Sequence, residues 1–139
     1  VLKSQRLLLT WMIDDENIFK QVRKMIGPED FGEPLYHTVA ELLYRQYEEG
    51  KANPAQIMNH FTDEEEHRRV AELFHTRLPE VSTVQEREKA LKETLLRIKQ
   101  HSLDEAMRSL NPADIDGLKK LMADKRELQH MKELHISVN

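Results

Sequence analysis

Three pairs of glutamate and histidine have a spacing that suits a metal site. Each has the Glu-x-x-His pattern that di-iron proteins use on facing helices of a bundle: Glu64 and His67, Glu72 and His75, and Glu127 and His130. A complete site also needs a further glutamate from each of two other helices. Glu64 and His67 instead suit the solvated first turns of a helix. In a chain with 25 acids and 7 histidines this short pattern arises by chance. We therefore predict no metal site and keep a di-iron bundle enzyme only as a minor alternative.

Motifs for other catalytic chemistry are absent from the sequence. The chain has no cysteine, so it offers no thiol nucleophile, thiolate metal ligand or disulfide, as suits a reducing cytoplasm. It has no serine within the glycines of a nucleophile elbow, no glycine-rich phosphate loop and no His-Glu-x-x-His motif. We therefore expect no catalytic residue and no cofactor in this chain, which on these grounds is not an enzyme.

One cluster of basic residues lies near the C-terminal end. It comprises Lys119, Lys120, Lys125 and Arg126. Asp116 and Asp124 each lie four residues from Lys120, so on a helix these acids offset the field that phosphate binding requires. The whole chain carries a net charge of −4 with both signs interleaved. We predict a solvated face without strong nucleic-acid binding.

Composition favours a small helical domain with an appendage. Of the 139 residues 39% are hydrophobic and 33% are charged, so much of the surface is solvated. The longest apolar run, Leu7 to Ile13 with Thr10 inside it, is too short to span a bilayer, and no signal peptide is visible. We expect a cytoplasmic protein without a membrane partner. The chain begins at Val1 and opens almost directly into a helix, so we interpret it as a piece of a longer protein.

Helical spacing dominates the chain, and capping residues indicate where each helix begins. The expected helices follow Ser4, Asp14 or Asp15, Glu33, Asn53, Thr62, Thr83 and Asn111. The first is apolar on nearly every side, so it should lie at the centre of a bundle. The sequence therefore predicts an all-α protein, with a helical bundle over residues 1–100 followed by a C-terminal helical hairpin over residues 101–139.

The boundary of this division rests on a change in the apolar pattern. The stripe that contains Leu91, Leu95 and Ile98 is followed by a polar interval at residues 99–102. The next apolar residues, from Leu103 onward, lie on a rotated face, which implies a new packing partner. Ser102 can begin a capping box, so either the helix breaks there or it continues with a new face outward.

The last helix needs a partner for its apolar face. Two helices have too little mutual surface to cover it, so the face must fold back onto the bundle or dock on another protein. The rotated stripe favours docking. The predicted partner-binding residues are Leu118, Leu121, Met122, Leu128, Met131 and Leu134.

Three segments resemble a known family. They are Arg6-Leu-Leu-Leu-Thr-Trp-Met-Ile-Asp14, the stretch from His60 to Phe74, and the ending from Asn111 to Leu134. Together they closely resemble the C-terminal domain of bacterial replicative DNA primases of the DnaG type, over essentially the whole chain. The resemblance lies in the helix pattern and in these stretches, not in a catalytic signature.

This resemblance implies both a fold and a partner. It implies a globular helical part followed by a helical hairpin that anchors to the N-terminal collar of the hexameric DnaB-type replicative helicase and modulates it. Primer synthesis, with its zinc and magnesium, would lie elsewhere in the parent primase, and the free domain would be a monomer. The N-terminal domain of the helicase itself is similar in fold and remains the alternative within the replisome.

Overall fold

The structure is a computed structural model that describes residues 2–75 and 83–133. Within these ranges the chain forms helices and turns, without a strand, so the predicted all-α class is confirmed. None of the helices described there is long and apolar enough to cross a bilayer. In chain order the helices are α1 (Leu2–Asp14), α2 (Glu16–Val22), the 3-10 helix η1 (Pro28–Asp30), α3 (Pro34–Glu49), α4 (Pro54–His60), α5 (Glu64–His75), α6 (Val84–Ser109) and α7 (Ile115–Met131).

The first helix lies at the centre of the bundle, as its sequence predicts. It packs against α2, α3, α5 and α6, and the side chains of Leu8, Leu9 and Met12 are fully buried. The helix begins at Leu2, so Ser4 is not its N-cap. Ser4 is instead buried within the first turns, beside α6. The prediction was wrong here because burial against α6, rather than a serine cap, stabilises this end of the helix.

Three of the expected caps are confirmed. Asp15, Asn53 and Thr83 cap α2, α4 and α6, each accepting a hydrogen bond from a backbone N–H two or three residues later, at 2.8, 3.2 and 3.1 Å. Pro34 and Pro54 occupy the first positions of α3 and α4, where the missing proline N–H costs nothing. Caps of this kind depend only on residues that are close in the sequence, so the sequence alone can indicate where these helices start.

Two other helix starts differ from the prediction. Asp63, not Thr62, accepts the capping bond of α5, at 3.1 Å, and its negative charge also suits a helix N-terminus. The last helix begins at Ile115, because Asp114 provides its cap at 2.9 Å. Asn111 instead closes the preceding turn, through a 2.9 Å bond from the backbone N–H two residues later.

The segment between α2 and α3 is held in place by α3. The Tyr44 hydroxyl donates a 2.6 Å hydrogen bond to the carbonyl oxygen of Ile26, and Nδ1 of His37 donates to that of Pro28 at 2.8 Å. Burial raises the pKa of Tyr44, and nearby carboxylates raise it further, so its hydroxyl stays protonated and remains a donor. These bonds fix η1 on the surface of the bundle.

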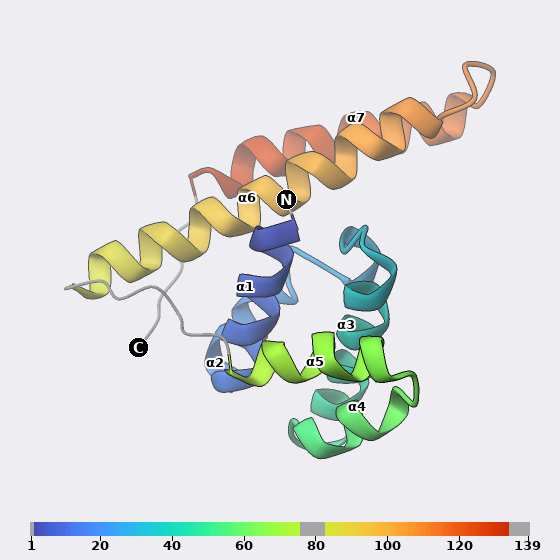
Figure 1. Cartoon of the computed structure of the whole chain (residues 1–139). Coiled ribbons are helices and arrows are strands. Elements are labelled where there is room, and N and C mark those ends of the chain that lie inside the picture. Colours follow the sequence, from blue (N-terminus) through green and yellow to red (C-terminus); the bar gives the residue numbers. More distant parts are fainter. Residues whose placement is uncertain (1, 76–82, 134–139) are drawn as a thin grey trace.

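The sixth helix belongs to two parts of the structure. Its first half packs on the bundle through Leu91, Leu95 and Ile98, whereas its second half extends beyond the bundle beside α7 (Figure 1). The helix runs through Ser102 without a break, which decides the alternative that the sequence left open. The predicted boundary at residue 100 therefore falls inside one continuous helix, and the bundle and the hairpin are joined by that helix.

Candidate interaction surface of the helical hairpin

The second half of α6 and α7 form a hairpin with a small core of its own. Buried residues from both helices make up this core: Leu103, Leu121, Leu128 and Met131. Leu96, Met107 and Leu110 pack around it, and Met25 contributes from the bundle side. This cluster is separate from the main core, so the change of stripe near residue 101 reflects a change of packing partner from α1 to α7.

The structure separates the predicted partner-binding residues that it describes into a buried set and an exposed set. Three are buried in the hairpin core, each 5–6% exposed: Leu121, Leu128 and Met131. Leu118 and Met122 remain on the surface, with 39% and 51% of their area exposed. Leu134 lies outside the described residues. Among the described residues, the apolar stripe of the sequence is thus wider than the face that α6 covers, and its exposed members lie at one edge.

Ile115 extends this exposed edge. It is 65% exposed and precedes Leu118 by three residues and Met122 by seven, so the three side chains share one face of α7. We refer to Ile115, Leu118 and Met122 as the hairpin stripe. The sequence interpretation omits Ile115 from the binding residues, although its i, i+3, i+7 spacing is the signal that would have included it.

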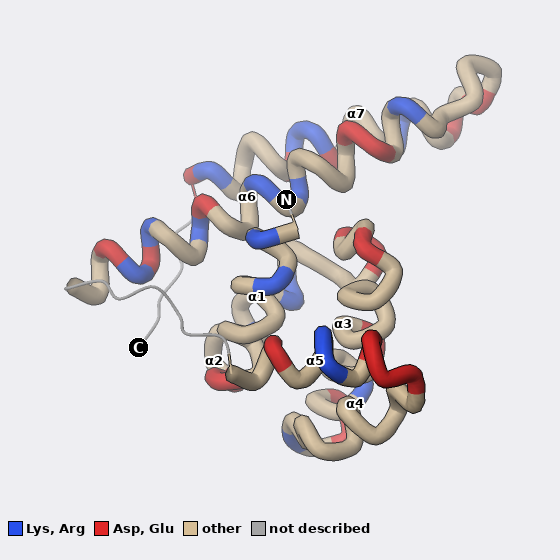
Figure 2. The backbone as a smooth tube through the Cα atoms, in the orientation of Figure 1, with Lys and Arg blue, Asp and Glu red and all other residues tan. Residues whose placement is uncertain are grey.

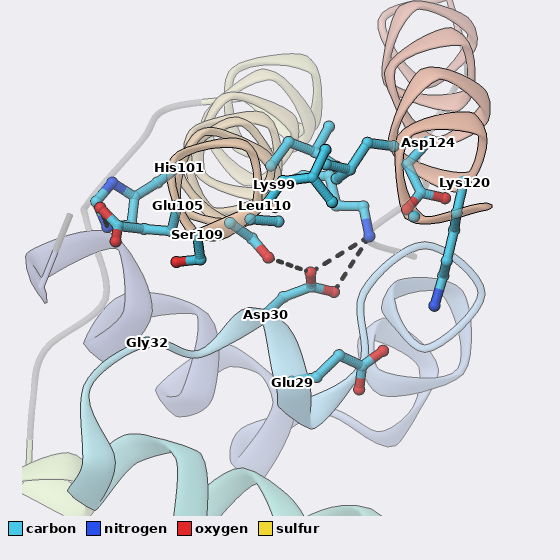
Figure 3. Close-up of a pocket in the computed structure, with 15 residues that line it drawn as sticks. Glu29, Asp30, Gly32, Lys99, His101, Glu105, Ser109, Leu110, Lys120 and Asp124 are labelled. Atoms are coloured by element: carbon cyan, nitrogen blue, oxygen red, sulfur yellow. Dashed lines mark hydrogen bonds and ion pairs between the residues drawn. The ribbon is translucent and has the colours of Figure 1, made fainter. Parts of the chain in front are cut away.

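Asp30 in η1 anchors the base of the hairpin to the bundle. Its carboxylate is 4% exposed and accepts hydrogen bonds from the Ser102 hydroxyl at 2.7 Å and from the Lys99 ammonium group at 3.3 and 3.4 Å (Figure 3). The backbone N–H of Gly27 donates a further bond at 3.0 Å. With three donor groups the carboxylate is satisfied despite its burial. The polar interval at residues 99–102 contains two of these donors, but the sequence does not show which acid they meet.

A cavity of about 610 Å³ lies between η1, the second half of α6 and α7. Charged residues of both signs line it, including Glu29, Glu105, Lys120 and Asp124. Figure 3 shows Lys120 extending from α7 on the side of η1. None of the three residues of the hairpin stripe contributes to this lining. The two sides of α7 therefore differ in chemistry: charged residues of both signs line the cavity, and the exposed apolar side chains of the hairpin stripe lie outside its lining.

The glutamate and histidine pairs do not assemble into a shared site in the part of the chain that is described. No group of three or more histidine, aspartate or glutamate side chains there is placed to hold a metal ion. Glu72 pairs with Arg68 at 3.0 Å on the exposed surface of α5. This arrangement gives no support to the di-iron alternative.

Comparisons with known proteins give no relative: neither a family model, nor a curated protein, nor a solved structure matches this chain. The functional interpretation therefore depends on the residues of the chain and on the geometry of its hairpin.

Proposed function

We propose that this chain is the helicase-interaction domain of a bacterial replicative DNA primase of the DnaG type. In this proposal it binds the N-terminal collar of the hexameric DnaB-type helicase, modulates the helicase and recruits RNA primer synthesis to the replication fork in the cytoplasm. The observation that carries the proposal is the hairpin stripe. Three exposed aliphatic side chains on one face of a helix that lies outside the bundle are typical of helix-in-groove docking.

The division of the chain supports the same interpretation. The main core lies in α1 to α5 and the first half of α6, and the hairpin adds a second, smaller core beyond it. This arrangement agrees with the globular part and hairpin that the sequence resemblance implies. The chain itself would act as a monomeric binding module, and the zinc- and magnesium-dependent steps of primer synthesis would belong to other parts of the parent primase.

A binding experiment with paired variants tests the proposal. The chain should co-elute with the hexameric DnaB-type helicase of the same organism, and calorimetry should give the affinity. Leu118→Asp combined with Met122→Asp should weaken binding by about two orders of magnitude, because each introduced charge would be buried in an apolar interface. The matched control is Leu2→Asp, which changes another exposed leucine, 56% exposed at the start of α1, and should bind as the parent does.

The same variants also report on the fold. Leu118 and Met122 are exposed, so their replacement should change the free energy of unfolding by less than about 1 kcal/mol. Loss of binding with an unchanged urea midpoint would therefore identify a contact rather than a folding defect. Failure of the parent chain to bind the helicase, or full binding by the double variant, would overturn the proposal.

A further inference from the structure

Three cations share the exposed face of α7 with the hairpin stripe. Lys119 and Arg126 follow Ile115 by four and eleven residues, and Lys125 follows Met122 by three. Since a helix turns by about 100° per residue, all three lie within about 70° of the centre of the stripe. Each is exposed, and none forms an ion pair with another residue in the described ranges. These charges are therefore available to a partner.

The acids of α7 lie on its other faces. Asp124 lines the cavity, and Asp116 and Glu127 lie more than about 120° around the helix from the centre of the stripe. Basic and acidic residues are intermixed along the hairpin (Figure 2), so the face, not the position in sequence, separates them. The offset of charge expected from the sequence is strongest for Lys120, which lines the cavity and has an aspartate four residues away on each side, and it is weaker for the three cations beside the stripe.

From this arrangement we infer that the hairpin stripe docks in an apolar groove whose rim carries carboxylates. The inference rests on the proposed function and specifies the partner surface at the same site. Leu118 and Met122 would fill the groove, while Lys119, Lys125 and Arg126 would meet acidic side chains on its rim. Rim charges of this kind act mainly on the rate of association, through long-range attraction that salt screens.

Charge complementarity favours this occupant over a nucleic acid. Aliphatic side chains occupy the middle of the face, where a phosphate backbone offers them no apolar contact. The helix has no Phe, Tyr or Trp on which bases could stack. A protein groove with acidic edges satisfies both the apolar and the cationic side chains, so it fits the whole face.

Association kinetics with a charge-matched control test the inference. The triple variant Lys119→Gln, Lys125→Gln and Arg126→Gln removes the cations beside the stripe. The control, Lys20→Gln, Arg23→Gln and Lys24→Gln, removes three exposed cations from α2 and the turn after it, so both variants have the same net charge. Stopped-flow association with the hexameric DnaB-type helicase at low salt should be about tenfold slower for the stripe variant, with a flatter salt dependence. The control should associate as the parent does.

The outcomes separate this inference from the proposed function. If the parent does not bind the helicase at all, both are overturned. If the parent binds and the stripe variant keeps its association rate and salt dependence, only the acidic rim is overturned. A titration with a single-stranded DNA oligonucleotide completes the test. Oligonucleotide binding by the parent that the stripe variant loses would make this face a nucleic-acid surface and would also overturn the inference.

Discussion

The carboxylate of Asp30 accepts a 2.7 Å hydrogen bond from the hydroxyl of Ser102, across 72 positions of the sequence. Lys99, one turn earlier on the same helix, donates to the same carboxylate at 3.3 Å. Because Asp30 lies in η1 and the two donors lie in the middle of α6, these bonds fix the point at which α6 leaves the bundle. Together with the packing of Leu91, Leu95 and Ile98 on the bundle, this anchor positions the helix against which α7 packs.

Replacing Asp30 by Ala should lower the free energy of unfolding by about 2 kcal/mol, because three donors lose an acceptor that is nearly inaccessible to water. Urea unfolding followed by circular dichroism measures this change. Glu29→Ala, at the exposed neighbouring position, is the control and should stay within about 0.5 kcal/mol of the parent. Equal midpoints for the two variants would show that the Asp30 contacts contribute nothing to stability.

The two edges of the apolar stripe should respond differently to truncation. Leu128→Ala removes a side chain from the hairpin core and should cost about 2 to 4 kcal/mol. Leu118→Ala trims an exposed side chain and should cost less than about 1 kcal/mol. Thermal and urea unfolding of the whole chain compare them. Similar losses for both would mean that Leu118 is covered within the free chain.

Replacing Gly117 by Ala should not raise the free energy of unfolding, although Gly117 lies inside a helix. A methyl group there would clash with Oδ2 of Asp114, whose other carboxylate oxygen accepts the capping bond from the Gly117 N–H at 2.9 Å. Displacing the cap costs about 1 kcal/mol or more, which offsets the gain of about 1 kcal/mol in helix propensity.

A double-mutant cycle isolates this effect. In the parent chain, Gly117→Ala should lower the free energy of unfolding or leave it unchanged. In the Asp114→Ala variant, in which the cap is already absent, the same substitution should raise it. Unfolding free energies of the four proteins give the coupling. The same change in both backgrounds would show that the cap and the glycine are independent.

Stability should fall at alkaline pH as Tyr47 ionises. Its hydroxyl donates to the carbonyl oxygen of Met12 at 2.5 Å, and burial, with nearby acids adding to it, raises the pKa of Tyr47 from 10.0 to about 12. A raised pKa means that the folded state favours the protonated phenol, so this contribution is complete below pH 10 and is lost as the pH rises to about 12.

The Tyr47→Phe variant removes this dependence together with the hydrogen bond. It should be less stable than the parent by about 1 kcal/mol at neutral pH. It should also lose less stability between neutral and alkaline pH, with Tyr44 still contributing. Urea unfolding over a pH series, with phenolate absorbance to follow ionisation, measures both. Parallel pH profiles for the two proteins would contradict the assignment.

Local chemistry in the sequence determined the helical class and the positions at which several helices begin. Asp15, Asn53 and Thr83 cap their helices as predicted, because a capping side chain needs only the backbone N–H groups that follow it. The central place of α1 was also predictable, because a helix that is apolar on nearly every side must be covered on nearly every side. The change of stripe after Ile98 likewise indicated where α6 changes its packing partner.

Only the tertiary structure decided which side of α7 meets α6 and which acid meets Lys99 and Ser102. The apolar residues of α7 spread over more than half of its circumference, and the sequence alone does not rank their faces. The rotation of α7 about its own axis is set by the turn that ends at Asp114 and by the packing of Leu121 and Leu128 on α6. This rotation leaves Ile115, Leu118 and Met122 exposed. Asp30 is likewise an ordinary loop acid in sequence, because a contact across 72 positions depends on how the intervening helices pack. Burial and pairing of this kind arise only when distant surfaces come together, whereas helix starts depend on neighbours in the chain.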